Sequence, residues 1–218
     1  MIKPRVKICC ISSKQEAFDA IEAGAAALGL VGEMPSGPGV ISDGEIFEIA
    51  CLVPPPVGTF LLTSRTNAKD IIEHHGRTQT STIQIVDELI EGSYAEIRHA
   101  LPGIKLVQVV HVIDEKSIDE AVELAESVDA ILLDSGNPKL EIKELGGTGR
   151  KHDWRLSRKI VESIDKPVFL AGGLDHANVL EAIETVRPFG LDLCSGVRTG
   201  GKLDRRKLER FFEALGKI

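Results

Sequence analysis

The stretch Asp129-Ala-Ile-Leu-Leu-Asp-Ser-Gly-Asn-Pro138 places a short apolar run directly before an acidic residue. Ala130 to Leu133 has the length and composition of a strand that is buried on both faces of a parallel sheet. Asp134 is the first residue that such a strand cannot bury without cost. Barrel enzymes carry their reacting groups at the carboxyl ends of their strands. The stretch therefore predicts a carboxylic acid at the working end of a buried parallel strand.

Glycine-rich motifs follow this strand and the next two expected strands. Gly146-Gly-Thr-Gly149, which includes Gly147 and Thr148, precedes a helical pattern, so its backbone N–H groups can meet an anion at a helix start. Gly172-Gly173 and Ser195-Gly196 occupy the corresponding places further along the chain. Each motif is weak alone, because glycine pairs occur in many turns. Their joint position after three consecutive strands predicts a phosphate site.

Strand-like and helix-like segments alternate about eight times along the 218 residues, with short connections. This alternation predicts a single (β/α)₈ TIM barrel over residues 1–218, with a doubly wound open sheet as the competing fold. The expected strands are 6–10, 26–31, 57–62, 81–86, 105–112, 130–133, 167–170 and 190–194. Four of the expected helices span residues 68–75, 94–99, 117–126 and 154–164. Another is capped by Ser12 or Ser13, one contains Ile46, one runs from a cap at Asp175 through Thr185, and the last is capped by Asp204.

The composition is that of an ordinary globular protein, with 43% hydrophobic and 27% charged residues. A net charge of −7 gives no general attraction to nucleic acid or to an anionic membrane. We therefore expect a phosphorylated small molecule as the ligand. No signal peptide or membrane span is visible, and the four cysteines have neither disulfide nor zinc spacing. These features indicate a cytoplasmic protein with reduced thiols. The sequence leaves open whether the protein is a monomer or a homodimer.

Position at the strand ends selects the candidate functional residues. Cys9 or Cys10 follows the first strand, Gln84 lies in the fourth, and His111 ends the fifth. Cys9 as a thiolate and Asp134 as an acid could form a pair for proton transfer. The alternatives are a buried structural cysteine, an aspartate that anchors a loop and a histidine with a structural role. His74 and His75 are expected at a solvated helix end.

The motifs resemble those of the phosphoribosylanthranilate isomerase family over nearly the whole chain. Besides the three glycine motifs, the similarity rests on Lys7-Ile-Cys9, Glu22-Ala-Gly-Ala25, Leu28-Gly29, Gln84, Leu132-Leu-Asp134, Asp153-Trp154 and Asn178-Val179. The resemblance implies an Amadori rearrangement in tryptophan biosynthesis, with Cys9 as general base and Asp134 as general acid. It also implies that the glycine motifs bind the substrate phosphate and that neither a metal nor an organic cofactor is needed.

The chain departs from the family pattern at positions that bear on the substrate. Gly39 stands where the family has an arginine that holds the anthranilate carboxylate, and Cys10 stands where it has glycine. Val86-Asp87 replaces His-Gly, and Arg198 stands where many members have glutamate. Either Arg198 or Arg65 holds the carboxylate instead, or the enzyme isomerises a phosphoribosylamine with another aglycone. A barrel that binds a sugar phosphate without catalysis is the alternative from another functional class.

Overall fold

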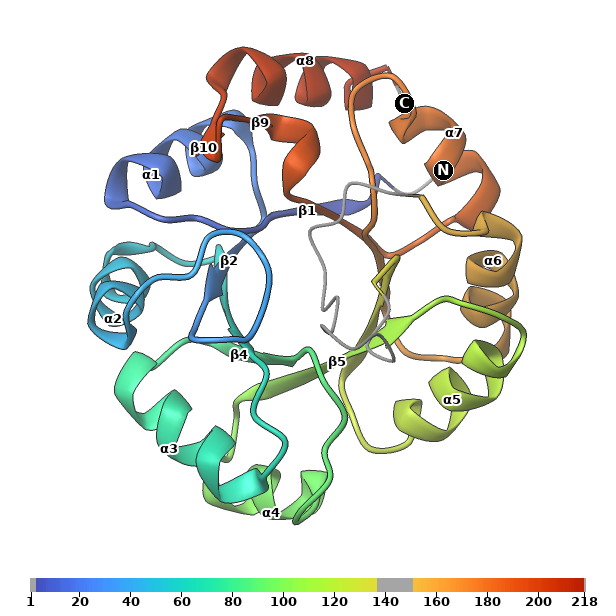
Figure 1. The fold of residues 1–218 in the computed structure, drawn as a ribbon. Coiled ribbons are helices and arrows are strands. Elements are labelled where there is room, and N and C mark those ends of the chain that lie inside the picture. Colours follow the sequence, from blue (N-terminus) through green and yellow to red (C-terminus); the bar gives the residue numbers. More distant parts are fainter. Residues whose placement is uncertain (1–2, 137–150, 218) are drawn as a thin grey trace.

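Eight parallel strands close into a barrel in the computed structural model, which describes residues 3–136 and 151–217 (Figure 1). Each strand pairs with the next, and the eighth pairs with the first. The strands are β1 (Arg5–Ile8), β2 (Ala27–Val31), β3 (Gly58–Thr63), β4 (Thr82–Ile85), β5 (Lys105–His111), β6 (Ala130–Asp134), β7 (Val168–Leu170) and β8 (Gly190–Leu193). The predicted (β/α)₈ barrel is confirmed, and the open sheet is excluded because β8 and β1 are hydrogen-bonded.

Helices surround the barrel on its outer side (Figure 1). They are α1 (Lys14–Ala23), α2 (Asp43–Leu52), α3 (Ala68–Thr78), α4 (Tyr94–Ala100), α5 (Lys116–Ala125), α6 (Trp154–Ser163), α7 (Val179–Val186) and α8 (Arg205–Leu215). After β8 come a 3₁₀ turn (Ser195–Val197) and a small hairpin of β9 (Arg198–Thr199) and β10 (Lys202–Leu203), which lies beside α1 and α8. Within the described ranges, no helix combines the length and apolarity needed to cross a bilayer.

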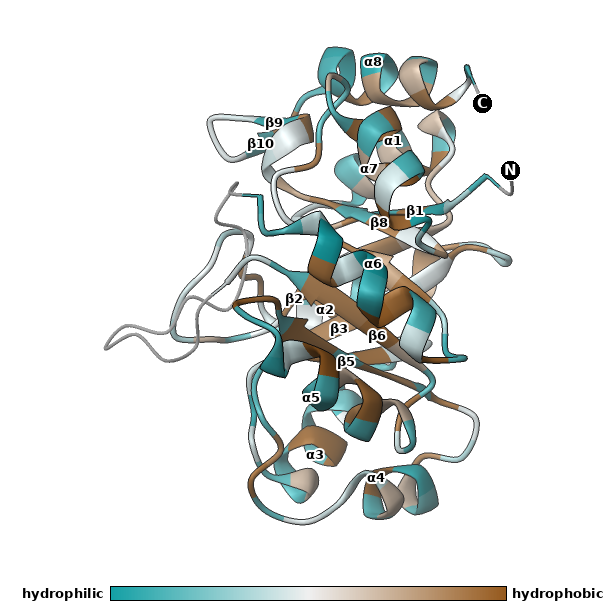
Figure 2. Ribbon diagram, turned by 90° about the vertical axis from the view of Figure 1, so that its right-hand side faces the viewer, coloured by the Kyte–Doolittle hydropathy of each residue, from teal (hydrophilic) through white to brown (hydrophobic). Residues whose placement is uncertain are grey.

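The apolar side chains form two layers of core. One layer lies between the strands and the helices, and the other fills the barrel interior, so the strands at the centre of Figure 2 are largely hydrophobic. Alternate residues of a strand point to opposite faces. On β6, Ile131 and Leu133 pack outward, whereas Ala130 and Leu132 pack inward. Asp134 has the inward parity, which brings its carboxyl group over the interior of the barrel.

Side-chain caps fix where several helices begin. Ser13 caps α1 and Asp204 caps α8 by accepting backbone N–H groups of the first turn, as the sequence predicts. The prediction that Asp175 caps a helix is wrong, because α7 begins only at Val179. The Asp175 carboxylate instead accepts the N–H groups of Ala177 and Asn178 in a turn before the helix. That turn keeps the chain after β7 in loop conformation at the barrel mouth.

Candidate active site

A cavity opens at the carboxyl ends of the strands. It is lined by Cys9, Cys10, Val31, Met34, Ser36, Gly37, Pro38, Leu62, Gln84, Val86, Asp134, Ala171, Gly172, Gly173, Leu174, Asp192, Cys194 and Ser195. The cavity therefore collects residues that are distant in sequence, as expected where all strands of a barrel end together. Cys9, Gln84, Asp134, Gly172, Gly173 and Ser195 are candidates from the sequence that lie together here. Gly147, Thr148 and Gly149 fall outside the described residues.

Asp134 ends β6 and faces the cavity with a side chain that is almost removed from solvent. The residue is 9% exposed, and its Oδ1 atom accepts the N–H of Ser135 at 2.7 Å. Burial raises the pKa of the Asp134 carboxyl group to about 6, with the Ser135 hydrogen bond acting in the opposite direction. A carboxyl group with this pKa holds its proton near neutral pH often enough to donate it.

Cys9 lies directly after β1 and lines the same cavity as Asp134. Its N–H donates to Leu193 O at 2.7 Å, so the β1–β8 pairing fixes its backbone. Gly29 on β2 leaves room for the thiol, because a Cβ at this position would lie 2.9 Å from the Cys9 sulfur. Cys9 is a free thiol. Cys9 and Asp134, which the sequence predicts as a pair for proton transfer, therefore line the same cavity.

A buried ion pair, which was not predicted from the sequence, lies in the barrel interior next to Cys9 and Asp134. Lys7 on β1 is 0% exposed, and its Nζ atom lies 2.8 Å from Oδ1 of Asp192 on β8. Burial disfavours the charge on Lys7, but the charge and hydrogen bond of Asp192, together with the neighbouring Cys9 and Cys10, outweigh burial and raise the pKa of Lys7. The sequence signal for this ion pair is that each of two otherwise apolar strands contains one charged residue in its interior. Lysine and aspartate are rarely buried unless they are paired.

The loops after β7 and β8 form the described part of the expected phosphate site. Gly172 and Gly173 have φ values of 87° and 64°, in the left-handed region that favours glycine. Neither of their N–H groups donates to another described residue. A Cβ at Gly196 would lie 1.9 Å from Leu174 O, so only glycine allows the two loops to approach this closely. Together with Ser195, these loops present backbone donors at the cavity edge, where an anion could bind.

Gln84 lies inside the barrel on β4 and lines the cavity. Its side chain is buried, and its Oε1 atom has no hydrogen-bond partner among the residues that the structure describes. An unpaired buried acceptor costs free energy. A substrate hydroxyl or amine group that donated to this oxygen would recover that free energy, which favours the expected role of Gln84 in substrate binding.

The expectation that Arg198 contacts the substrate is corrected, because this side chain does not line the cavity. Arg198 is buried against α1, where its guanidinium donates to Glu16 Oε2 at 3.0 Å and to the carbonyl groups of Cys10 and Gly201. The carboxylate of Glu16 balances its charge, and backbone carbonyl groups accept further N–H groups of its two terminal nitrogens, whereas its Nε atom has no partner among the described residues. Arg198 thus ties the segment after β1 to the β9–β10 hairpin. Arg65, the other candidate, is not among the described lining residues either.

Gly39 and Cys10, the two departures from the family pattern, touch each other. Gly39 has φ 78°, and a Cβ built on it would lie 2.5 Å from the Cys10 Cβ atom. Cys10 itself adopts φ 64°, which is uncommon for a residue with a side chain. No arginine can therefore occupy position 39 without moving the segment after β1. Among the described residues that line the cavity there is no arginine or lysine.

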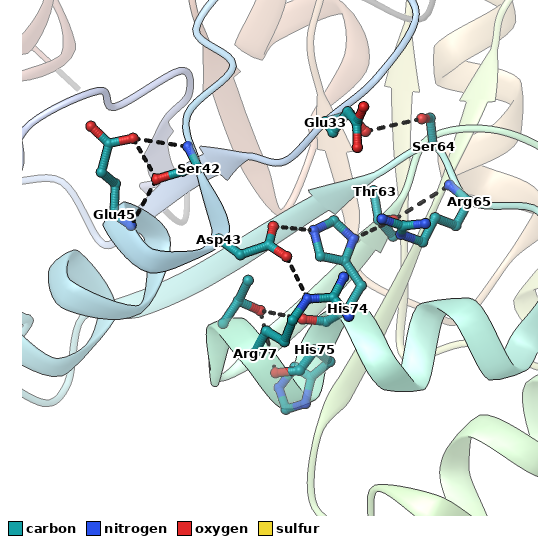
Figure 3. A network of polar contacts seen from close by, with 11 residues as sticks. Glu33, Ser42, Asp43, Glu45, Thr63, Ser64, Arg65, His74, His75 and Arg77 are labelled. Atoms are coloured by element: carbon teal, nitrogen blue, oxygen red, sulfur yellow. Dashed lines mark hydrogen bonds and ion pairs between the residues drawn. The ribbon is translucent and has the colours of Figure 1, made fainter.

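A polar network anchors the loop that carries Gly39 (Figure 3). His74 on α3 bridges two elements, because its Nδ1 lies 3.0 Å from Thr63 Oγ1 and its Nε2 lies 3.0 Å from Asp43 Oδ1. Arg77 Nε donates to the other oxygen of Asp43 at 2.6 Å. The prediction that His74 and His75 lie at a solvated helix end is wrong, since both are buried. The network joins the end of β3 to the start of α2, and this junction fixes the far end of the loop.

The contact between Gly39 and Cys10 predicts that Gly39→Arg is destabilising. We expect a loss of about 2–4 kcal/mol in the free energy of unfolding, from the strained φ and the overlap with Cys10. Urea unfolding at constant m-value measures it. The double variant Cys10→Gly/Gly39→Arg removes the nearest atom and should recover part of the loss. Gly44→Arg on exposed α2, where an added Cβ meets no atom within 4 Å, is the matched control. Equal stability of both arginine variants would contradict the steric argument.

Comparison with known proteins agrees with this geometry. The family model described as N-(5′-phosphoribosyl)anthranilate (PRA) isomerase matches residues 6–214. The N-(5′-phosphoribosyl)anthranilate isomerase of Methanocella arvoryzae is 31% identical over 210 residues, which is 96% of each chain. The crystal structure of phosphoribosyl anthranilate isomerase from Thermotoga maritima superposes with a TM-score of 0.82 at 29% identity, covering 99% of this chain and 100% of that one.

A second solved structure contains a ligand. It is a phosphoribosyl anthranilate isomerase in complex with reduced 1-(o-carboxyphenylamino)-1-deoxyribulose 5-phosphate, with a TM-score of 0.79, 26% identity and coverage of 99% of this chain and 100% of that one. The match of the family model extends over almost every strand and helix of the barrel. This chain belongs to the N-(5′-phosphoribosyl)anthranilate isomerase family.

Proposed function

We propose that the protein isomerises N-(5′-phosphoribosyl)anthranilate to 1-(o-carboxyphenylamino)-1-deoxyribulose 5-phosphate, a step of tryptophan biosynthesis. The observation that carries the proposal is that Cys9 and a buried Asp134, whose pKa is about 6, line one cavity at the barrel mouth. An Amadori rearrangement needs one group that donates a proton to oxygen and another that removes a proton from carbon. Membership of the isomerase family supports the same reaction.

The proposed mechanism uses each group once. Asp134 donates its proton to the ring oxygen of the ribose as the ring opens to a Schiff base. Cys9, as a thiolate, then removes the proton from the carbon that carries the 2-hydroxyl group, and the resulting enol tautomerises to the ketone. The N–H groups after β7 and β8 hold the phosphate, and Gln84 accepts a hydrogen bond from the substrate. The reaction needs no metal or organic cofactor, and the protein acts in the cytoplasm as a monomer or a homodimer.

A steady-state assay with freshly generated phosphoribosylanthranilate tests the proposal through the loss of anthranilate fluorescence. We expect kcat/KM on the order of 10⁴ M⁻¹s⁻¹ or more. Cys9→Ala should lower kcat by about 10²–10⁴-fold, because it removes the base that acts on carbon. Cys51→Ala, which changes an exposed thiol on α2, should leave kcat unchanged. Loss of activity in both variants would refute the specific role of Cys9, and binding without turnover in the wild type would favour a non-catalytic barrel.

A second candidate is the same rearrangement of a phosphoribosylamine with a different aglycone. It is favoured by Gly39 and by the lack of a basic side chain among the described cavity residues, since a guanidinium–carboxylate pair is a strong, geometrically specific contact. Parallel assays with the phosphoribosylamines of anthranilate and of an aniline without the carboxylate distinguish the two candidates. A higher kcat/KM for the compound without the carboxylate would establish the second.

A further inference from the structure

Three of the four cysteines gather where β1 and β8 end. Cys9 and Cys10 follow β1, Cys194 follows β8, and the two strands pair in parallel with Ile8 opposite Leu193. All three cysteines line the cavity as free thiols. The sulfur atoms of Cys10 and Cys194 lie only 2.8 Å apart. The proposed isomerisation uses Cys9 and leaves this thiol pair without a role.

Cys10 and Cys194 differ in acidity and in exposure to solvent, and both differences favour oxidation of Cys194. The contact between the two sulfur atoms raises the pKa of Cys10 and lowers the pKa of Cys194, so that Cys194 is the more acidic thiol of the pair. Cys194 is also the more exposed of the two, whereas Cys10 is buried. An acidic, accessible thiol beside a second thiol is the arrangement found in cysteines that respond to oxidants.

Little movement separates the pair from a covalent bond. A disulfide bond is about 2.05 Å long, so the sulfur atoms need to approach by about 0.8 Å from their separation of 2.8 Å. The backbone on both sides is fixed, since Cys9 N–H donates to Leu193 O and Arg198 donates to the carbonyl group of Cys10. The approach therefore falls to the two side chains and leaves the barrel closed.

We propose that Cys10 and Cys194 are a site of reversible oxidation by peroxides. The Cys194 thiolate attacks the O–O bond of a hydroperoxide, which yields a sulfenic acid and, after protonation, water or an alcohol. The Cys10 sulfur then attacks the sulfur of the sulfenic acid and displaces its oxygen as water, while its own proton is lost. The two thiols give up two electrons and two protons, and one hydroperoxide is reduced. A dithiol reverses the reaction by thiol–disulfide exchange.

The cross-link would change the wall of the candidate active site. Cys10 lies next to the position that a Cβ of Gly39 would occupy, so a displaced Cys10 side chain alters the packing of the β2–α2 loop. It would also withdraw a thiol from the neighbourhood of Cys9. We therefore expect oxidation to lower turnover and a dithiol to restore it. This effect on turnover rests on the proposed function, whereas the cross-link itself does not.

Oxidation of the purified full-length protein with hydrogen peroxide tests the site directly. After alkylation and digestion without reduction, we expect a cross-linked pair of peptides and a fall from four free thiols to two. Cys9 and Cys10 share the tryptic peptide 8–14, so variants must identify the partner of Cys194. The cross-link should persist in Cys9→Ala and in Cys51→Ser and should vanish in Cys10→Ala. In Cys10→Ala, a sulfenic-acid probe such as dimedone should label Cys194.

Three results would overturn the proposal. They are a cross-link that survives in Cys10→Ala, oxidation confined to Cys9 or Cys51, and full oxidation of Cys194 to a sulfinic acid in the wild type without any disulfide. The peptide masses do not depend on catalysis, so a protein that forms the cross-link but does not turn over phosphoribosylanthranilate would refute the proposed function alone. A protein that turns over this substrate and forms no cross-link would refute the oxidation site alone.

Discussion

Asp134→Asn is expected to lower turnover by orders of magnitude and at the same time to stabilise the protein above neutral pH. The amide keeps the shape of the side chain and can still accept the N–H of Ser135, but it has no proton to donate to the ring oxygen. General acid catalysis contributes about 10²–10⁴-fold, so kcat should fall by that factor. A variant whose kcat stays within threefold of the wild type at pH 7 would remove Asp134 from the mechanism.

The gain in stability follows from the pKa of the buried carboxyl group. In the folded protein, burial raises the pKa of Asp134 from 3.8 to about 6. Below pH 3.8 both the folded and the unfolded chains hold the proton, so the full stability is present. As the pH rises through about 6, the unfolded chain has already ionised and the folded protein must carry a buried charge. A shift of about two units corresponds to about 3 kcal/mol lost at pH 8, and the neutral amide avoids this loss.

Urea unfolding at pH 4 and pH 8 measures this difference. Asp134→Asn should match the wild type near pH 4 and exceed it at pH 8 by at most about 3 kcal/mol, because the amide also brings N–H groups that need an acceptor. Asp129 at the other end of β6 is the matched control. Burial opposes ionisation of Asp129, but the hydrogen bonds from Leu106 N–H and Arg98 and the charges of Arg98 and Lys105 together lower its pKa, so Asp129→Asn should be less stable than the wild type at pH 8. Effects of the same sign in both variants would contradict the burial argument.

The barrel could be predicted from the sequence because its determinants are local. Apolar runs of strand length alternate with helical patterns, and each observed strand lies within one or two residues of its predicted range. The cap residues Ser13 and Asp204 were also identifiable, since capping depends on neighbours in the chain. Asp175 failed as a cap because the competing turn that it stabilises uses the same side-chain chemistry.

The candidate site was only partly predictable, because several of its contacts join residues far apart in the chain. Cys9 and Asp134 follow from position at strand ends, but the partner of Arg198 does not. A positive charge after β8 can bind a substrate or a buried carboxylate, and only the fold shows that Glu16 on α1 lies within reach. The same holds for His74, whose burial depends on Asp43 and Thr63 from other elements. Gly39 and Cys10 were each recognised as unusual, but their mutual contact is tertiary.

The buried pair of Lys7 and Asp192 gives the second large expected effect. Lys7→Met keeps the approximate length of the side chain and leaves the Asp192 carboxylate buried without its partner. Breaking a buried ion pair on one side costs about 3–5 kcal/mol, which is a large part of the stability of an ordinary domain. The Lys7 charge also lowers the pKa of Asp134, so its removal should shift the alkaline limb of the pH–rate profile upward.

Chemical unfolding and the pH dependence of kcat/KM together test this expectation. Lys105→Met is the matched control, because the exposed Lys105 lies 3.7 Å from Asp129 and its loss should cost less than about 1 kcal/mol. The double variant Lys7→Met/Asp192→Leu removes both charges and should recover most of the lost stability, since a buried pair can be replaced by apolar side chains with little loss. If the double variant were no more stable than Lys7→Met, the cost would lie in the packing of Lys7 against Phe60 and its neighbours in the barrel interior, and not in an uncompensated charge.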